Sequence, residues 1–129
     1  MNPIYLETHF ECSDEVDDWP VEFAIITAYE TTGENWPDAK NQKANQQLEK
    51  YLLKQGRWVR KLTGYSPTSG HREPGWAVEL GMKAACDIGL QYNQDAIYYV
   101  SGDTLSVSFC DSRRALVEIG SFRSRVHFA

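Results

Sequence analysis

The stretch EFAIITAYE, residues 22–30, decides the fold expected for this chain, because it is the clearest strand in the sequence. It is a short apolar run rich in β-branched and aromatic residues, and its length favours a strand over a helix. An uninterrupted apolar run of this kind is typical of a strand buried on both faces. We therefore expect residues 22–30 to form an interior strand of a sheet.

Two amphipathic helices are predicted further along the chain. From about residue 39 to 55, apolar side chains recur at helical spacing opposite a face of Lys, Gln and Asn, with Asp38 as the expected N-cap and Gly56 as the C-cap. Residues 81–93 carry a second apolar stripe of helical period. Gly89 within that stripe suggests close packing of the helix against a sheet.

The remaining elements are predicted as strands and loops. Residues 56–65 alternate like a half-exposed strand, residues 66–75 form a loop and residues 76–80 a short strand. Two strands then flank a hairpin turn at Gly102 and Asp103. Residues 111–129 fit either a strand with a tail or a short helix from Ser112 followed by a strand, and both alternatives stay open.

The order β-α-β-β-α-β predicts a ferredoxin-like α+β fold. In that two-layer sandwich both helices cover one face of an antiparallel sheet, and an extra C-terminal hairpin strand is added here. The length of 129 residues predicts a single domain over residues 1–129. Within it we expect an acidic N-terminal extension at 1–20, an α+β core at 22–110 and a C-terminal strand or tail at 111–129.

Charge is distributed unevenly along the chain. Residues 1–39 hold ten Asp or Glu and no Lys or Arg, whereas residues 40–129 hold thirteen Lys or Arg against eight Asp or Glu. The acidic arm is interpreted as a solubilising extension, with a nucleic-acid mimic or a lid over a basic surface as the alternative.

The sequence predicts a cytoplasmic protein without a membrane span. No window approaches the roughly 18 consecutive apolar residues of a spanning helix, and the first residues are acidic rather than basic and then apolar. The cysteines, at 12, 86 and 110, lack C-x-x-C spacing, and the histidines, at 9, 71 and 127, are scattered. We therefore expect no disulfide framework, no metal site and no cofactor. The sequence also lacks a Walker motif and a G-x-G-x-x-G motif, either of which would have indicated a bound nucleotide.

Four short words occur in an order that resembles a known family. FAIITAYE, the spacing in NQKANQQL, REPGWAV and LQYNQDAI resemble a small, mostly bacterial family of uncharacterised proteins, the domain of unknown function numbered three-two-nine-three, over about residues 22–100. The resemblance implies a bacterial or phage origin and supports the order of elements, but it implies no activity. The residues that match the family's motifs are Thr27, Ala28, Asn41, Glu73, Pro74, Gln94, Ala96 and Ile97.

The chain departs from the family pattern at several of these motifs. Glu30 and Thr31 stand where the family has Asn-Pro, and Gly75 stands where it has Ser. Tyr92 and Asn93 replace a Phe-Gly pair. A site that used the Asn amide or the Ser hydroxyl would be altered in this protein.

The favoured interpretation of function is a non-catalytic binding domain for a small polar ligand or a protein partner. Polar side chains from several strand ends could converge in one cleft, as recognition of a small ligand requires. Each of them also has an ordinary structural explanation, such as capping a helix. The candidate ligand-binding residues are Thr27, Glu30, Asn41, Arg60, Glu73 and Gln94.

Two other classes of function remain as alternatives. In a small hydrolase-type enzyme, Glu73 and His71 would act as an acid–base pair, with an arginine such as Arg60 holding an anion. In a nucleic-acid-binding module, Trp76 would stack a base near basic residues, although the single aromatic residue and Glu79 make this partner unlikely. A free sheet edge could also pair two copies of the chain into a homodimer.

Overall fold

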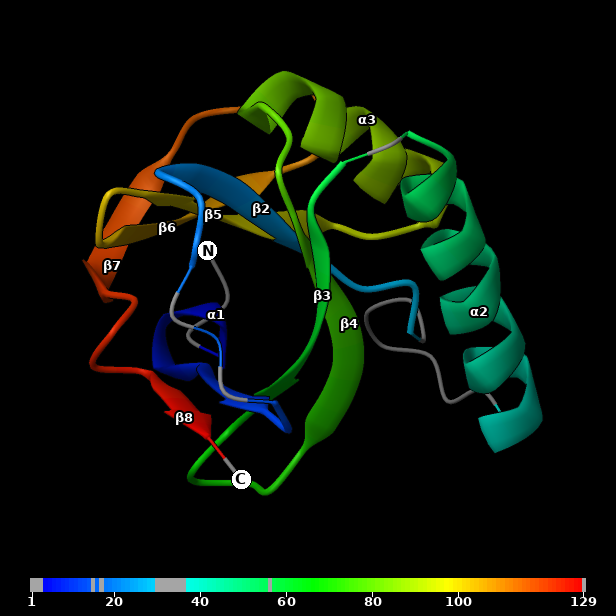
Figure 1. Ribbon diagram of the computed structural model, residues 1–129, viewed down its shortest axis with the longest axis horizontal. Helices are drawn as coiled ribbons and strands as arrows, with labels where there is room; N and C mark the ends of the chain where they lie inside the picture. The colour runs from blue at the N-terminus through cyan, green and yellow to red at the C-terminus, as the bar shows by residue number, and fades with distance from the viewer. Residues whose placement is uncertain (1–3, 15, 17, 30–36, 56, 129) are drawn as a thin grey trace.

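The computed structural model describes residues 4–14, 16, 18–29, 37–55 and 57–128. Within this part of the chain, eight strands form one curled sheet with the order β7-β6-β5-β2-β4-β3-β1-β8. Figure 1 shows the sheet bending round like a half-barrel, with two long helices on its outer side and a short helix on its inner side.

The elements have the following bounds. The helices are α1 (Ile4–Glu7), α2 (Asp38–Lys54) and α3 (Met82–Gln91). The strands are β1 (His9–Cys12), β2 (Glu22–Ile26), β3 (Val59–Tyr65), β4 (Arg72–Val78), β5 (Ala96–Ser101), β6 (Thr104–Phe109), β7 (Val117–Ser121) and β8 (Val126–Phe128).

Strand β2 is an interior strand, as its apolar sequence predicts. It pairs antiparallel with β4 on one side and with β5 on the other, and four of its five residues are buried. The sheet is mixed because β1 and β8 pair in parallel, whereas the other neighbouring strands are antiparallel.

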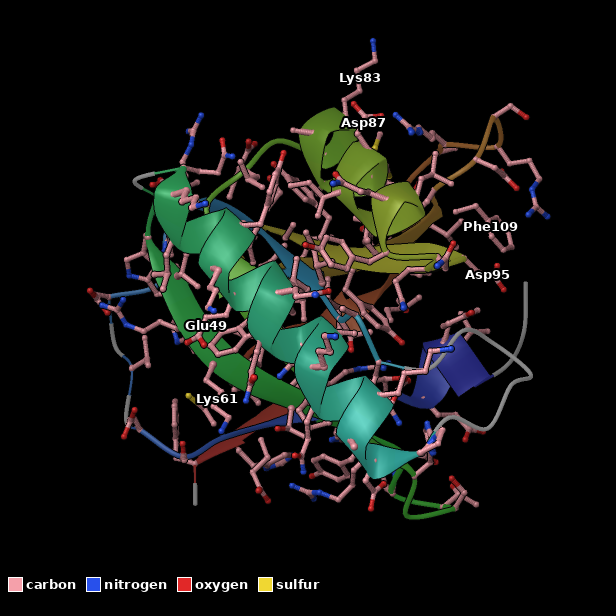
Figure 2. All side chains as sticks on the ribbon, turned by 90° about the vertical axis from the view of Figure 1, so that its right-hand side faces the viewer. Glu49, Lys61, Lys83, Asp87, Asp95 and Phe109 are labelled. Atoms are coloured by element: carbon pink, nitrogen blue, oxygen red, sulfur yellow. The ribbon has the colours of Figure 1, made fainter. Side chains whose placement is uncertain are left out.

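The outer face of the sheet packs under α2 and α3, which Figure 2 shows lying over the same face. Alternate residues of the strands point to this side, including Ala24, Ile26, Trp76 and Val78. They meet apolar side chains of the two helices in one buried cluster, and Trp76 donates a hydrogen bond from Nε1 to Asn45 Oδ1 of α2 at 2.9 Å. On α3, the labelled Lys83 and Asp87 point away from the sheet (Figure 2).

The inner face of the sheet holds a second apolar core, which is rich in aromatic side chains. Phe10, Phe23 and Phe122 are almost fully buried there, with ring centroids 5.2 to 5.9 Å apart in the pairs that touch. Trp19 packs on Phe23 at 5.2 Å. Curling the sheet therefore lets its concave side bury a core of its own without a second layer.

The expected ferredoxin-like two-layer sandwich is wrong. The two helices cover the central part of the sheet, but β6 and β7 on one side and β1 and β8 on the other extend and curl it into a half-barrel. A two-layer sandwich would leave the second sheet face to solvent, whereas here Phe10 and Phe122, from outside the expected core, bury that face. Local periodicity predicts each helix and strand, but it does not specify how many strands pair into one sheet.

The N-terminal segment is built into this sheet, contrary to the expected extension outside the core. Strand β1 lies between β3 and β8, and Phe10 and Cys12 are buried on its inner side. Val16 is buried in the same cluster. Alternate positions of this strand are apolar, but the acidic residues around them give the segment the composition of an exposed extension.

Strand β4 begins at Arg72, so the segment 72–75, expected as loop, is extended and paired. Pro74 is tolerated there because the carbonyl of Pro74 faces the end of β2, where it accepts a hydrogen bond from Thr27 Oγ1 at 2.9 Å. In an antiparallel strand the N–H and C=O of one residue point to the same side. An N–H at position 74 would therefore also point to the end of β2, and its absence costs no hydrogen bond of the ladder.

Several local predictions are confirmed and one is corrected. Helices α2 and α3 and the hairpin at Gly102, whose φ is +63°, lie where the sequence places them. Asp38 is the first residue of α2 rather than its cap, because Pro37 occupies the N-cap position. Gly56, the expected C-cap, lies outside the described residues. Residues 111–129 contain two strands, β7 and β8, so neither expected alternative, a strand with a tail or a short helix followed by a strand, matches in full.

Among the described residues, the helices are too short or too polar to cross a membrane.

Candidate functional site

A pocket opens at the end of the sheet where β2 finishes and β4 and β5 begin. Its cavity volume is about 90 Å³. Parts of the chain that are far apart in sequence line it, because antiparallel neighbours bring their opposite ends together at the same edge. The lining residues are Tyr5, Thr8, Phe10, Ile25, Ile26, Thr27, Leu62, Gly64, Tyr65, Ser66, His71, Glu73, Gly75, Gln94, Ala96 and Tyr98.

The pocket combines an apolar floor with a polar rim. Phe10, Ile25 and Leu62 belong to the inner core and are at most 6% exposed. Glu73 and His71 are more open, with side chains 32% and 46% exposed. A cleft of this composition suits a small ligand that has both an apolar and a polar part.

His71 and Glu73 approach each other beside the cavity. Nε2 of His71 lies 3.5 Å from Oε2 of Glu73. Because β4 begins at Arg72, the backbone here is extended, so residues 71 and 73 share one side of the chain while Arg72 points to the other. Arg72 accordingly pairs with Glu11, with 2.7 Å between Nη2 of Arg72 and Oε1 of Glu11.

Tyr98 supplies a hydroxyl inside the same pocket. The hydroxyl donates to Thr8 Oγ1 at 2.7 Å and lies 3.3 Å from the carbonyl oxygen of Tyr5. Burial raises the pKa of Tyr98 well above its ordinary value, and the negative charge of Glu73 raises it further. The hydroxyl of Tyr98 therefore stays protonated at neutral pH.

Thr27 and Gln94 line the pocket but use their polar groups to hold its wall. Thr27 Oγ1 donates to the carbonyl of Pro74 and accepts a bond from the N–H of Tyr29 at 3.0 Å. Nε2 of Gln94 donates to the carbonyls of Tyr29 at 2.8 Å and Tyr92 at 3.2 Å. These bonds tie the end of β2 to β4 and to the end of α3.

The other predicted candidates do not join this pocket. Asn41 lies on α2, is 1% exposed, and its Oδ1 has no hydrogen-bond partner among the described residues. Arg60 lies near the opposite end of β3, where its guanidinium stands 4.7 Å from the centre of the Trp58 ring and 3.7 Å from Asp18. Glu30 lies outside the described residues. Of the predicted set, the structure therefore brings together Thr27, His71, Glu73 and Gln94.

Sequence reasoning missed the residues that the N-terminal segment and β5 contribute. Tyr5 and Thr8 were assigned to an extension, although they form the side of the pocket nearest α1. Tyr98 alternates with the outward-facing Ile97 and Tyr99, so its place on the inner face was visible in the strand period. That signal could have found Tyr98 once β5 had been assigned.

The cysteines and the other histidines lie away from the pocket. Cys12, Cys86 and Cys110 are buried free thiols. His9 and His127, expected to be scattered, lie together because β1 pairs with β8, and their Nδ1 and Nε2 atoms are 3.0 Å apart. The described residues contain no group of three side chains that could hold a metal ion.

These features define an α+β half-barrel with a mixed apolar and polar pocket at one end of its sheet. The model of the family described as protein of unknown function, DUF3293, matches residues 26–97, which is more than half of the chain. The chain belongs to this family, which confirms the resemblance seen in the sequence words. No curated protein and no solved structure matches the chain.

Proposed function

We propose that this protein binds a small polar ligand in the pocket beside His71 and Glu73. The observation that carries the proposal is the carboxylate and imidazole pair, 3.5 Å apart, at the mouth of a cavity with an apolar floor. Charged and polar groups that converge at one edge of an otherwise apolar cleft favour recognition of a compact ligand.

Binding is favoured over catalysis by the state of two hydroxyl groups that line the pocket. Tyr98 stays protonated, and Thr27 already donates its hydroxyl proton to the carbonyl of Pro74. Neither of these two hydroxyl groups is thus an activated nucleophile.

A thermal-shift screen of the purified protein tests this proposal. Nucleotides, common metabolites, divalent metal ions and short RNA and DNA oligomers are compared for a saturable rise in melting temperature, because a ligand of the folded state must stabilise it. The variant Ala96→Phe, which fills the pocket, should abolish the rise, while Val117→Phe on the exposed part of β7 should retain it. A rise that survives Ala96→Phe would place binding elsewhere and refute the proposal.

An acid–base enzyme is the second candidate, and the short distance between His71 and Glu73 is the observation that favours it. With a ligand in hand, Glu73→Gln separates the two candidates. An enzyme would lose turnover while the variant still binds the ligand, and a binding protein would show no turnover with either chain.

The nucleic-acid alternative finds little support in the positions of its expected residues. Trp76 is 7% exposed beneath α2, so its ring is not presented for stacking on a base. Arg60, Arg113 and Arg114 pair with carboxylates, which lowers the charge available to phosphates.

We also propose that the chain acts as a single domain in the bacterial cytoplasm. The three free and buried thiols are compatible with a reducing compartment.

A further inference from the structure

His9 and His127 lie side by side on the two strands that meet at one edge of the sheet. Strand β8 has only three residues and pairs in parallel with β1. Nδ1 of His9 is 3.0 Å from Nε2 of His127, and the two ring planes differ by 9°. These two residues, the histidine pair, therefore share a hydrogen bond across the contact that holds β8 on the sheet.

This hydrogen bond requires one nitrogen that carries a proton and one that does not. Two neutral imidazoles meet the requirement, and so does a pair in which one ring is an imidazolium that donates to its neutral neighbour. When both rings are charged, two N–H donors of like charge face each other. The second proton therefore removes the hydrogen bond and puts repulsion in its place.

The surroundings of the histidine pair carry further charges. The ring of Tyr65 in β3 lies against both imidazoles, and the guanidinium of Arg72 in β4 lies 5.6 Å from the centre of that ring. Glu11, which is opposite His127 in the strand register, is paired with Arg72. The guanidinium of Arg125 donates to backbone carbonyls. Two arginines and one carboxylate thus give these surroundings a net positive charge, which opposes a second proton on the pair.

The pKa of His9 agrees with this arrangement. Burial lowers it below its ordinary value of 6.5, and the positive charges of His127 and Arg125 lower it further. Because the imidazole takes up a proton more readily when the contact is open, acid favours the open state. The contact is therefore most stable above about pH 6.5 and weakens as the pH falls below that value.

We propose that the histidine pair is a pH-sensitive contact, which holds β8 on β1 until both imidazoles are protonated and then lets the strand separate. Few other side chains hold this strand, since His127 and Phe128 are exposed and Val126 alone of the three packs on the inner core. The proposal is independent of a ligand in the pocket, because side chains alternate along β1 and Phe10, not His9, belongs to the inner core.

Hydrogen exchange at the amide of Phe10 tests the proposal, because this N–H donates to the carbonyl of Arg125 at 2.8 Å across the same contact. Exchange of the full chain is measured at pH 7.5 and pH 5 and expressed as protection factors, which correct for the intrinsic effect of pH. Protection of Phe10 should be at least about 3-fold lower at pH 5, while amides of the central β2 change by less than about 2-fold. An unchanged Phe10, or an equal fall in β2, would overturn the proposal.

The chain has three histidines, which provide matched variants. In His127→Gln the side chain stays polar but takes up no proton, so the protection of Phe10 should differ by less than about 2-fold between the two pH values. His71→Gln removes the histidine outside the pair and should leave the fall intact. A fall that persists in His127→Gln, or that disappears in His71→Gln, would assign it to another group.

Ring ¹⁵N chemical shifts supply a second measurement that needs no variant. They report the protonation of each imidazole between pH 7.5 and pH 5. The uptake of the second proton by the histidine pair should coincide with the fall in protection of Phe10. A fall that precedes this uptake, or a second proton taken up with no fall, would overturn the proposal.

Discussion

The closeness of α3 to the sheet depends on the absence of a side chain at Gly89. A Cβ atom there would lie 2.6 Å from Sγ of Cys110 and 3.0 Å from Cγ2 of Ile97, both buried. We expect Gly89→Ala to lower the free energy of unfolding by about 1–3 kcal/mol, because overpacking outweighs the roughly 1 kcal/mol by which Ala favours a helix. Urea denaturation measures the change, and Gly81→Ala, where nothing lies within 4 Å, is the control.

Two buried groups should make the protein less stable at high pH. Burial raises the pKa of Tyr99 and of Cys110 to about 12, from ordinary values of 10.0 and 9.0. Between about pH 9 and 12 the unfolded chain loses these protons first, so the free energy of unfolding falls as pH rises, by up to roughly 1.4 kcal/mol per pH unit for each group. Denaturant midpoints from pH 8 to 11 measure the fall, which Tyr99→Phe should make shallower. An equally steep fall in that variant would exclude Tyr99 as a cause.

At the scale of elements, the side chain of Thr27 links the end of β2 to β4 by a hydrogen bond. The isosteric change Thr27→Val removes the bond to Pro74 and the acceptor for the N–H of Tyr29. We expect a loss of about 1–2 kcal/mol in the free energy of unfolding. Ligand affinity of the folded molecule should change little, because the hydroxyl of Thr27 serves the wall rather than the ligand. Thr104→Val, at an exposed position on β6, is the matched control for both measurements.

At the scale of the whole molecule, Arg125 holds the two edges of the curled sheet together. Strands β7 and β8 are the opposite edges of the sheet but follow one another in sequence. The guanidinium of Arg125 donates to the carbonyl of Ile119 in β7 and to those of Leu6 and Thr8 ahead of β1, at 2.8 to 3.2 Å. This single side chain therefore bridges the gap that a half-barrel leaves open.

Replacing Arg125 by Met should loosen that closure. We expect a loss of about 1–3 kcal/mol in the free energy of unfolding, because three carbonyls lose a charged donor. Amide hydrogen exchange should quicken first in β1, β7 and β8, and less in the central β2. Arg123→Met removes the same positive charge from an exposed position and is the control. Uniformly faster exchange across the sheet would contradict a local role for Arg125 in closure.

The sequence predicted the elements better than their assembly. The apolar run at 22–30 and the stripe around Gly89 identify an interior strand and a tightly packed helix, since both depend on neighbours in the chain. Pro74 misled the assignment of 66–75, because its tolerance in β4 depends on where β2 stops. The strand at 9–12 was hidden by the acidic residues around Phe10 and Cys12.

The residues of the candidate site could likewise be predicted from the sequence only in part. His71 and Glu73 are two residues apart, so an extended backbone is enough to bring them together, and the sequence could name the pair. Tyr5, Thr8 and Tyr98 join them only because α1, β1 and β5 meet across the curled sheet. Arg60 was grouped with Glu73 in the sequence, but it lies near the other end of β3 beside Trp58.

The sequence by itself determined the family, the two long helices, the interior strand and the pair of residues at 71 and 73. Each of these follows from short-range periodicity or from a short motif, which depends on the order of neighbouring side chains. Only the tertiary structure decided that eight strands curl into one half-barrel and that a pocket forms where their ends meet. Pairing between distant strands sets both, and strand pattern alone does not specify which strands become neighbours.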